Sequence, residues 1–338
     1  MTIAWFRSTA RAAADAVAPD AVLAGLAAAH AIEPFDERSA HDFVWKHARQ
    51  PYDLCVYELG DVADSDFVRA YLFHYPGVLV ALDSIGDPYA TAASRLVLVS
   101  DEATAEVVQH HWPSAIVRTI PVGVTPFGTA ESAVGPDVRF AVIDDAQREL
   151  FSRALARARA AGAAATIAHS LADADVIVAT HWPPAAAAMV DAARAMSTGK
   201  PVIVLETDAT AGWPTLDPQT WQRRGYGDTR PPLAVSIDPR DDEHSLVLAI
   251  RRLCVDGALR ATLGAAAEAW WREHATVEQA VVAWDQVLRE ALLIPAPRPA
   301  NLPPALSADG TGRARELLAP FGVEVDFLAG STSHRKPG

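Results

Sequence analysis

Three polar residues in the first half of the chain each follow a short apolar run directly: Arg7, Asp83 and Ser100. The carboxyl ends of parallel strands meet at one edge of a sheet, and such sheets bind their ligands there. A carboxylate at that edge can take a catalytic role, and a guanidinium can bind phosphate oxygens. We therefore predict a catalytic role for Asp83 and substrate-binding roles for Arg7 and Ser100. The structural alternatives are turn capping for Asp83 and an exposed loop position for Arg7.

A second group of such residues lies in the other half of the chain. Thr180, His181 and Trp182 follow the apolar run 176–179. The rings of His181 and Trp182 can stack on a base or a sugar, or they can form a partly buried aromatic shelf. Lys200 precedes a proline at the mouth of another run, where phosphate binding and the shaping of a turn are both open. We predict substrate-binding roles for all four residues.

No pattern in the sequence predicts a metal site or a bound cofactor. Cys55 and Cys254 are the only cysteines, they lie far apart, and each is inside an apolar segment, which indicates buried free thiols in a reducing compartment. His110 and His111 are adjacent, so on a helix they point in different directions. No Gly-x-Gly-x-x-Gly pattern, phosphate-binding loop or nucleophile elbow follows a predicted strand.

The elements that carry these residues are short, nearly continuous apolar runs separated by helical patterns. Continuous apolar strands indicate a parallel sheet that is covered on both faces. In the first half the predicted strands are 3–6, 53–59, 77–82 and 95–99, and in the second half they are 139–143, 164–167, 176–179, 201–205 and 234–237. The pattern therefore predicts an α/β protein with two parallel sheets.

The boundary between the two halves is predicted at residues 125–136, which are rich in glycine and proline and have no periodicity. This divides the chain into a first domain, 1–124, and a second domain, 137–293. The second domain closes with a purely helical section, 242–293, which has breaks at Asp256-Gly257 and near His274. Residues 294–338 form a proline-rich tether and a tail.

Composition excludes several classes of protein. The net charge is −13 and no cluster of Lys and Arg with interleaved aromatic residues is present, so the footprint of a nucleic-acid partner is missing. No apolar run approaches the roughly 18 residues of a membrane-spanning helix. Charged residues interrupt the alanine-rich N-terminal stretch, unlike the core of a secretory signal, so we expect a cytoplasmic protein.

A series of motifs, in order along the chain, resembles bacterial GT-B glycosyltransferases of the retaining kind. The series comprises YDLCVYELG at 52–60, YPGVLV at 75–80, IPVGV at 120–124, ADADVIV at 172–178 and AMSTGKPVIV at 195–204. The resemblance implies two Rossmann-like parallel-sheet domains that face a cleft, with C-terminal helices. It also implies metal-independent transfer of a hexose from a nucleotide-sugar donor to an acceptor, and it assigns Gly123, in the IPVGV segment, to the substrate-binding residues.

Several positions depart from the family pattern. Leu82 replaces a histidine, Ala187 replaces a glutamate on the donor side, and the loop after the first strand lacks glycine. Asp144 and Asp145 stand where the family carries an arginine and a lysine that clamp phosphates, and two aspartates repel a diphosphate. These departures leave open a non-catalytic homologue that binds a partner glycosyltransferase, a glycan or a nucleotide, or that forms a homo-oligomer. A third hypothesis is an unrelated Rossmann-like protein that binds a ligand.

Overall fold

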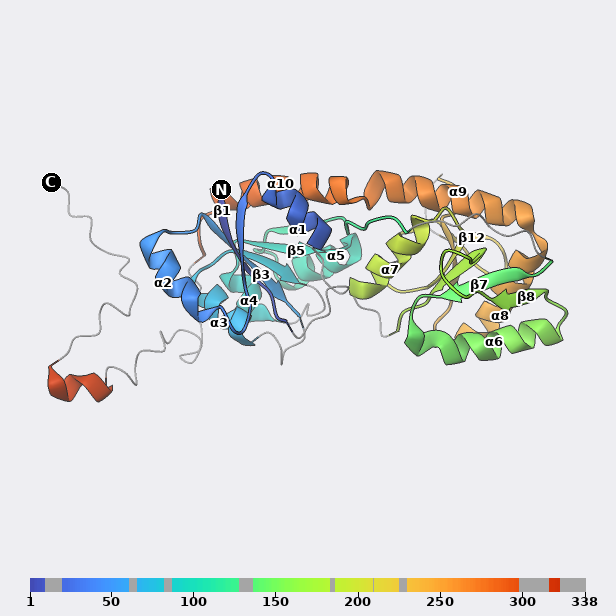
Figure 1. The fold of residues 1–338 in the computed structure, drawn as a ribbon, viewed down its shortest axis with the longest axis horizontal. Helices are drawn as coiled ribbons and strands as arrows, with labels where there is room; N and C mark the ends of the chain where they lie inside the picture. The colour runs from blue at the N-terminus through green and yellow to red at the C-terminus, as the bar shows by residue number, and fades with distance from the viewer. Residues whose placement is uncertain are drawn as a thin grey trace.

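The computed structural model describes residues 1–9, 20–60, 66–81, 87–127, 136–182, 186–208, 210–224, 230–297 and 316–322. These residues form two α/β domains, each built around one sheet, and the two domains lie side by side (Figure 1). Within this part of the chain no helix is both long and apolar enough to cross a membrane. The predicted boundary at 125–136 stays a prediction, because residues 128–135 lie outside the described ones.

The first sheet is parallel throughout and has the strand order β2-β1-β3-β4-β5-β6. Its inner strands are fully buried, and separate apolar clusters cover its two faces, as continuous apolar runs predict. The strands are β1 (Thr2–Phe6), β2 (Ala31–Phe35), β3 (Leu54–Leu59), β4 (Val78–Ala81), β5 (Leu96–Val99) and β6 (Val117–Thr119).

Two helices of the first domain, α4 and α5, begin at aspartates that cap them. The Asp87 carboxylate accepts hydrogen bonds from the backbone N–H groups of Tyr89 and Ala90, and Asp101 accepts one from Thr104. The helices are α1 (Asp20–Ala27), α2 (His41–Arg49), α3 (Asp66–His74), α4 (Pro88–Ala93) and α5 (Glu102–His111).

Strand β2 and helix α2 are absent from the sequence prediction, which joins the first helix directly to the strand at 53–59. Strand β2 is the edge strand of the sheet, and only Phe35 of its residues is buried. Glu33 and Pro34 interrupt its apolar pattern, as edge strands tolerate and central strands do not. A half-exposed edge strand therefore lacks the continuous apolar signal by which its neighbours are predicted.

The second sheet has the order β12-β11-β13-β10-β9-β7-β8, and all its pairs are parallel except β11 with β12. Its strands are β7 (Val138–Val142), β8 (Ala165–Ile167), β9 (Val176–Ala179), β10 (Val202–Leu205), β11 (Thr215–Leu216), β12 (Arg223–Arg224) and β13 (Ala234–Ile237). The short helix η3 (Asp145–Gln147) and helices α6 (Arg148–Ala160), α7 (Ala186–Met196) and α8 (Asp242–Val255) accompany them. The prediction of two parallel-sheet domains is confirmed.

Two long C-terminal helices, α9 (Gly257–His274) and α10 (Val277–Leu293), run one after the other along one side of both domains (Figure 1). Helix α9 packs on the second domain, whereas buried residues of α10 belong to the apolar core under β1, β3, β4 and β5. The chain thus returns to its first domain, and the predicted breaks before α9 and α10 are confirmed. Of the C-terminal tail, only 316–322 is described, and it includes η4 (Ala319–Phe321).

The two chain segments that pass between the domains lie against each other. The Val124 N–H donates to the Ala275 carbonyl at 3.0 Å, and Val124 and Thr276 form a parallel bridge. Thr276 then caps α10, because its hydroxyl accepts a hydrogen bond from the Gln279 N–H.

Candidate functional site

Each sheet has a switch point, where connections leave neighbouring strands in opposite directions. The first strand of each domain lies between the second and third: β1 lies between β2 and β3, and β7 lies between β8 and β9. In such sheets ligands bind at the carboxyl ends of the strands that flank this point. The relevant residues therefore follow β1 and β3 in the first domain, and β7 and β9 in the second.

At the switch point of the second sheet, polar side chains converge from three elements. His181 follows β9, and its Nδ1 lies 3.5 Å from Oδ2 of Asp144, which follows β7, and 3.9 Å from Oδ2 of Asp191 on α7. Thr180 is buried directly beside His181 in the chain. Sequence reasoning assigned Thr180 and His181 to this edge, and the structure brings them together with Asp144. Asp191 was missed, because nothing in a helical pattern indicates which face meets a neighbouring strand end.

Three atoms of this group are buried and lack a hydrogen-bond partner among the described residues: Thr180 Oγ1, His181 Nδ1 and Asp144 Oδ2. Asp144 uses its other carboxylate oxygen to accept a hydrogen bond from the Ala146 N–H, at 2.9 Å, and so caps η3. More than about nine in ten buried polar groups are paired in folded proteins. Two of the three, His181 Nδ1 and Asp144 Oδ2, lie 3.5 Å from each other, so the group is one polar cluster whose hydrogen bonds a ligand can complete.

A cavity of about 310 Å³ opens next to this group, at the carboxyl ends of β7 and β8. Helix α6 forms one wall, and the Arg148 guanidinium there is 2.5 Å from Asp145 Oδ1. The cavity is lined by Ala141, Val142, Ile143, Arg148, Phe151, Ser152, Ile167, Ala168, His169, Ser170 and Leu171. Its size suits a small molecule, and Asp144 follows its lining residue Ile143 directly in the chain.

Two other predicted residues of the second domain are placed differently. Trp182 is 54% exposed, so its ring is accessible next to His181. Lys200 lies before β10, at the amino end of that strand, and its Nζ donates to the backbone carbonyl of Leu171 at 3.2 Å and to that of Ala172. Burial lowers the pKa of Lys200. The structure does not bring Lys200 to the switch point, and its phosphate role stays a prediction.

At the switch point of the first sheet, Arg7 is held by a buried carboxylate. The guanidinium donates from Nε and Nη2 to Glu58, with distances of 2.6 to 3.0 Å, and its Nη1 lies 3.4 Å from Asp20. The Glu58 side chain is 1% exposed, and its Oε1 also accepts a hydrogen bond from Trp5 Nε1 at 2.7 Å. Glu58 was missed, although a charged residue inside an otherwise apolar strand was the available signal.

The remaining predicted residues of the first domain serve local structure where they are described. The Ser100 hydroxyl donates to Asp101 Oδ2 at 3.1 Å, beside the cap of α5. Gly123 packs between α1 and α10: a Cβ atom on it would lie 2.5 Å from Val22 Cγ2 and 2.6 Å from Ala280 Cβ. Asp83 lies outside the described residues, so its predicted catalytic role stays a prediction.

Metal ligation has no candidate in the part of the chain that the structure describes. There, no group of three or more His, Cys, Asp and Glu side chains is arranged to hold an ion. Cys55 is buried and Cys254 half-buried, and both are free thiols.

Comparison with protein-family models and with curated protein sequences gives no match. Solved structures match over most of the chain. Sucrose-phosphate synthase from Thermosynechococcus elongatus has a TM-score of 0.61 and 14% identity over 86% of this chain and 98% of its own. Anabaena Alr3699/HepE, solved in complex with UDP and glucose, has a TM-score of 0.59 and 14% identity over 86% of this chain and 100% of its own.

WaaG, a glycosyltransferase involved in lipopolysaccharide biosynthesis, has a TM-score of 0.53 and 11% identity over 84% of this chain and 99% of its own. Identities this low establish architecture and leave the chemistry open. The chain therefore has the GT-B fold of two parallel-sheet domains, as its ordered motifs predicted.

Proposed function

We propose that the protein binds a nucleotide sugar at the switch point of its second sheet and transfers the hexose to an acceptor. The observation that supports this proposal is the convergence there of three buried atoms that have no hydrogen-bond partner among the described residues: Thr180 Oγ1, and His181 Nδ1 and Asp144 Oδ2, which lie 3.5 Å apart. An unpaired buried polar group costs about 1–3 kcal/mol. A ligand that supplies hydrogen-bond partners to these atoms removes that cost, and the free energy gained favours its binding.

The chemistry of the group suits the hydroxyl groups of a ribose or a hexose. The carboxylates of Asp144 and Asp191 can only accept hydrogen bonds, whereas the Thr180 hydroxyl can donate and accept. A sugar presents several hydroxyls that do both. A GT-B protein of similar architecture, Anabaena HepE, was solved with UDP and glucose. We infer that the sugar and ribose portions of the donor provide most of the binding.

The diphosphate is the portion that the site suits least. Asp144 lies at the position where the family pattern has a phosphate-clamping cation, and like charges repel. A charge-assisted hydrogen bond contributes about 1.5–3 kcal/mol, so the absence of two of them weakens donor binding by a hundredfold or more. Donor affinity is therefore low in the isolated chain.

In the transfer itself, the bond between the anomeric carbon and the diphosphate oxygen breaks and the nucleoside diphosphate leaves. A hydroxyl oxygen of the acceptor bonds to the anomeric carbon, and its proton passes to the oxygen of the departing diphosphate. Asp83 is the residue we propose for a catalytic role at the edge of the first sheet, where the acceptor binds. Arg7 stands at the same edge, and the paired Glu58 fixes its guanidinium.

A second candidate, a non-catalytic homologue, is favoured by the way the predicted cations are engaged. Arg7 is paired with Glu58 and Lys200 donates to backbone carbonyls, so both already serve the protein's own structure. Such a homologue binds a donor, a glycan or a partner transferase through the same scaffold without turnover.

Calorimetric titration with UDP-, GDP-, ADP- and TDP-glucose tests the proposal. We expect one donor to bind, and Asp144→Asn to weaken it at least about tenfold. The variant loses charge-assisted hydrogen bonds to the sugar hydroxyls, worth about 1.5–3 kcal/mol, which outweigh the screened repulsion between Asp144 and the diphosphate, and asparagine still caps η3. Asp145→Asn is the matched control, since it removes the same charge from the next residue, whose side chain is 82% exposed.

Turnover distinguishes the two candidates. Release of nucleoside diphosphate in the presence of an acceptor, abolished by Asp83→Ala, supports the transferase. Donor binding without release under any acceptor supports the non-catalytic homologue. If no sugar nucleotide binds at millimolar concentration, or if both aspartate variants weaken binding equally, the proposed site is wrong.

A further inference from the structure

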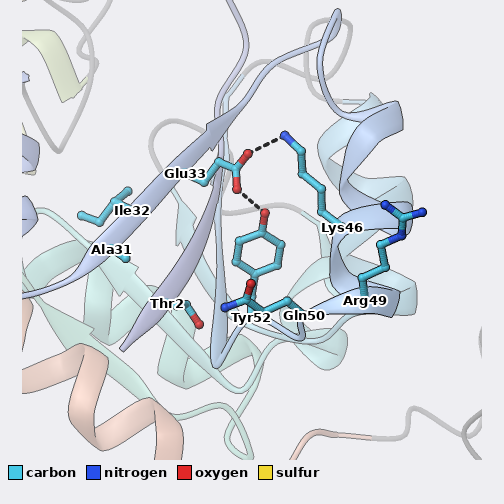
Figure 2. A pocket seen from close by; sticks show the side chains of 8 residues that line it. All are labelled: Thr2, Ala31, Ile32, Glu33, Lys46, Arg49, Gln50 and Tyr52. Atoms are coloured by element: carbon cyan, nitrogen blue, oxygen red, sulfur yellow. Dashed lines mark hydrogen bonds and ion pairs between the residues drawn. The ribbon is translucent and has the colours of Figure 1, made fainter.

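A second pocket, of about 530 Å³, lies at the opposite end of the first sheet from Arg7. It is formed by the first residues of β1, the edge strand β2 and the last turn of α2, so it faces the amino ends of the strands (Figure 2). Its volume is within the range of about 300–1,000 Å³ that small-molecule sites occupy. The lining residues are Thr2, Ala31, Ile32, Glu33, Lys46, Arg49, Gln50 and Tyr52.

Three polar side chains from different elements meet in this pocket (Figure 2). Lys46 Nζ lies 2.6 Å from Glu33 Oε1, and the Tyr52 hydroxyl donates to Glu33 Oε2. Hydrogen bonds from Lys46 and Tyr52 lower the pKa of Glu33, and the bond to Glu33 raises the pKa of Lys46. Glu33 and Lys46 are therefore both charged at neutral pH and cancel each other.

Arg49 adds one positive charge that this pair does not cancel. Its guanidinium carbon lies 4.2 Å from the ring centroid of Trp45, one helical turn earlier, and among the described residues no carboxylate forms an ion pair with it. Stacking on an indole occupies a face of the guanidinium and leaves the N–H donors at its edge available. The pocket therefore holds a net positive charge, in a chain whose net charge is −13.

The walls of the pocket are largely apolar. Ala31 and the ring of Tyr52 line one side, and the aliphatic stems of Lys46 and Arg49 lie opposite (Figure 2), whereas the Ile32 side chain turns to the other face of the sheet and packs on the core there. Beside the pocket the Trp45 ring, on which Arg49 stacks, is 63% exposed and extends the apolar surface. This surface suits an apolar ligand body next to one anionic group.

We propose that this pocket binds a small monocarboxylate whose body is a ring or an alkyl chain. The carboxylate pairs with the Arg49 edge, because the two N–H groups of a guanidinium edge match two carboxylate oxygens. Gln50 and Thr2 supply further hydrogen bonds, and the body covers Ala31 and the Tyr52 ring. This site lies apart from the switch points and does not depend on the proposed transfer reaction.

Benzoate is a suitable probe, and benzyl alcohol is its neutral counterpart of similar shape. Ligand-observed saturation-transfer NMR on the full chain should detect benzoate at millimolar concentration, with benzyl alcohol on the order of tenfold weaker. Arg49→Gln should weaken benzoate by a similar factor, whereas Arg38→Gln, an exposed arginine that does not line the pocket, should leave it unchanged. Ala31→Phe, which fills the pocket without altering charge, should also abolish the signal.

Arg49→Gln and Ala31→Phe both replace exposed side chains, so circular dichroism should show an unchanged fold. Absence of a benzoate signal from the wild-type chain would overturn the proposal. So would equal binding of benzoate and benzyl alcohol, or a benzoate signal that survives either Arg49→Gln or Ala31→Phe.

Discussion

The indole rings of Trp5 on β1 and Trp284 on α10 have centroids 5.0 Å apart and planes tilted by 47°. They come from opposite ends of the chain, and both are buried in the core of the first domain. Next to Trp284, Asp285 accepts a hydrogen bond at 2.7 Å from Nε2 of the buried His30. Helix α10 is thus part of the first domain's core, whereas α9 belongs to the second.

Replacement of Trp284 by alanine should therefore destabilise the first domain. The side chain is 0% exposed, and truncation of a buried tryptophan to alanine costs about 3–5 kcal/mol because it leaves a cavity. Trp284→Phe should cost much less, because among the described residues Trp284 Nε1 has no hydrogen-bond partner that its removal would leave unsatisfied.

Urea denaturation measures these differences. Trp45→Ala serves as the control, because that ring is 63% exposed and its loss should change stability by about 0.5 kcal/mol or less. Similar losses for Trp284→Ala and Trp45→Ala would show that α10 does not carry the first domain's core.

The buried pair of Arg7 and Glu58 should be sensitive to the loss of either partner. Glu58→Ala removes the acceptor of the Trp5 N–H and the buried partner of Arg7. Breaking a buried pair costs about 3–5 kcal/mol, and we expect the lower end of that range because Arg7 is 21% exposed and keeps a contact with Asp20. A double-mutant cycle with Arg7→Ala should show that the two losses are not additive, because the pair is broken only once.

The exposed pair of Arg118 and Glu290 is the matched comparison. Its side chains are 47% and 37% exposed, so solvent screens it and its removal should cost at most about 1 kcal/mol. Equal costs for the two pairs in denaturant titrations would mean that Glu58 is reached by water and that its burial is not what holds Arg7.

Continuous apolar runs predicted the central strands closely: 176–179 and 234–237 are the bounds of β9 and β13. The same signal cannot predict β2, which is an edge strand and contains Glu33 and Pro34. Only part of an edge strand is buried, so its sequence need not be continuously apolar. Polar residues after strands pointed to Thr180 and His181. The contact of His181 with Asp144 follows from the place of β7 beside β9, which depends on strand order and not on any local pattern.

The partners of Glu58 depend on strand pairing in the same way. Phe6 is the register partner of Tyr57, and so Arg7 lies next to Glu58 across the β1 and β3 pair. A sequence pattern shows that Glu58 interrupts an apolar strand, but it does not contain this register. Lys200 was placed at a strand mouth correctly, yet at its amino end, where the available acceptors are the carbonyls of Leu171 and Ala172.

Alkaline pH should destabilise the fold through Cys55. Burial raises the pKa of this thiol from 9.0 to about 12, so the folded chain keeps the proton at a pH where the unfolded chain has lost it. The stability contributed by the neutral buried thiol is present below about pH 9 and is lost as pH rises towards 12. From about pH 8 to pH 10, the wild-type chain should lose about 1 kcal/mol more than Cys55→Ala. Parallel pH profiles of the two proteins in urea denaturation would contradict this.

The contact between Gly264 of α9 and the turn at Gly199 should be the most sensitive point in the attachment of α9 to the second domain. A Cβ atom on Gly264 would lie 2.1 Å from the Gly199 carbonyl oxygen and 3.3 Å from Lys200 Cα. Both are backbone atoms. Gly199 has a φ of +67°, so the turn cannot easily move away from a methyl group on residue 264. Gly264→Ala must therefore move the whole helix.

The expected sign is opposite to that of an ordinary glycine-to-alanine change in a helix, which stabilises by about 1 kcal/mol. Overpacking costs about 1–3 kcal/mol, and contact with backbone places Gly264→Ala at the upper end, so we expect a net loss of about 2 kcal/mol in urea denaturation. Gly212→Ala is the control, because no atom of the described residues lies within 4 Å of the position that its methyl group would take, and the stability of this variant should be nearly unchanged. A more stable Gly264→Ala protein would mean that α9 packs less closely on the second domain than this contact indicates. The packing of α10 on the first domain would then be the main attachment of the two C-terminal helices.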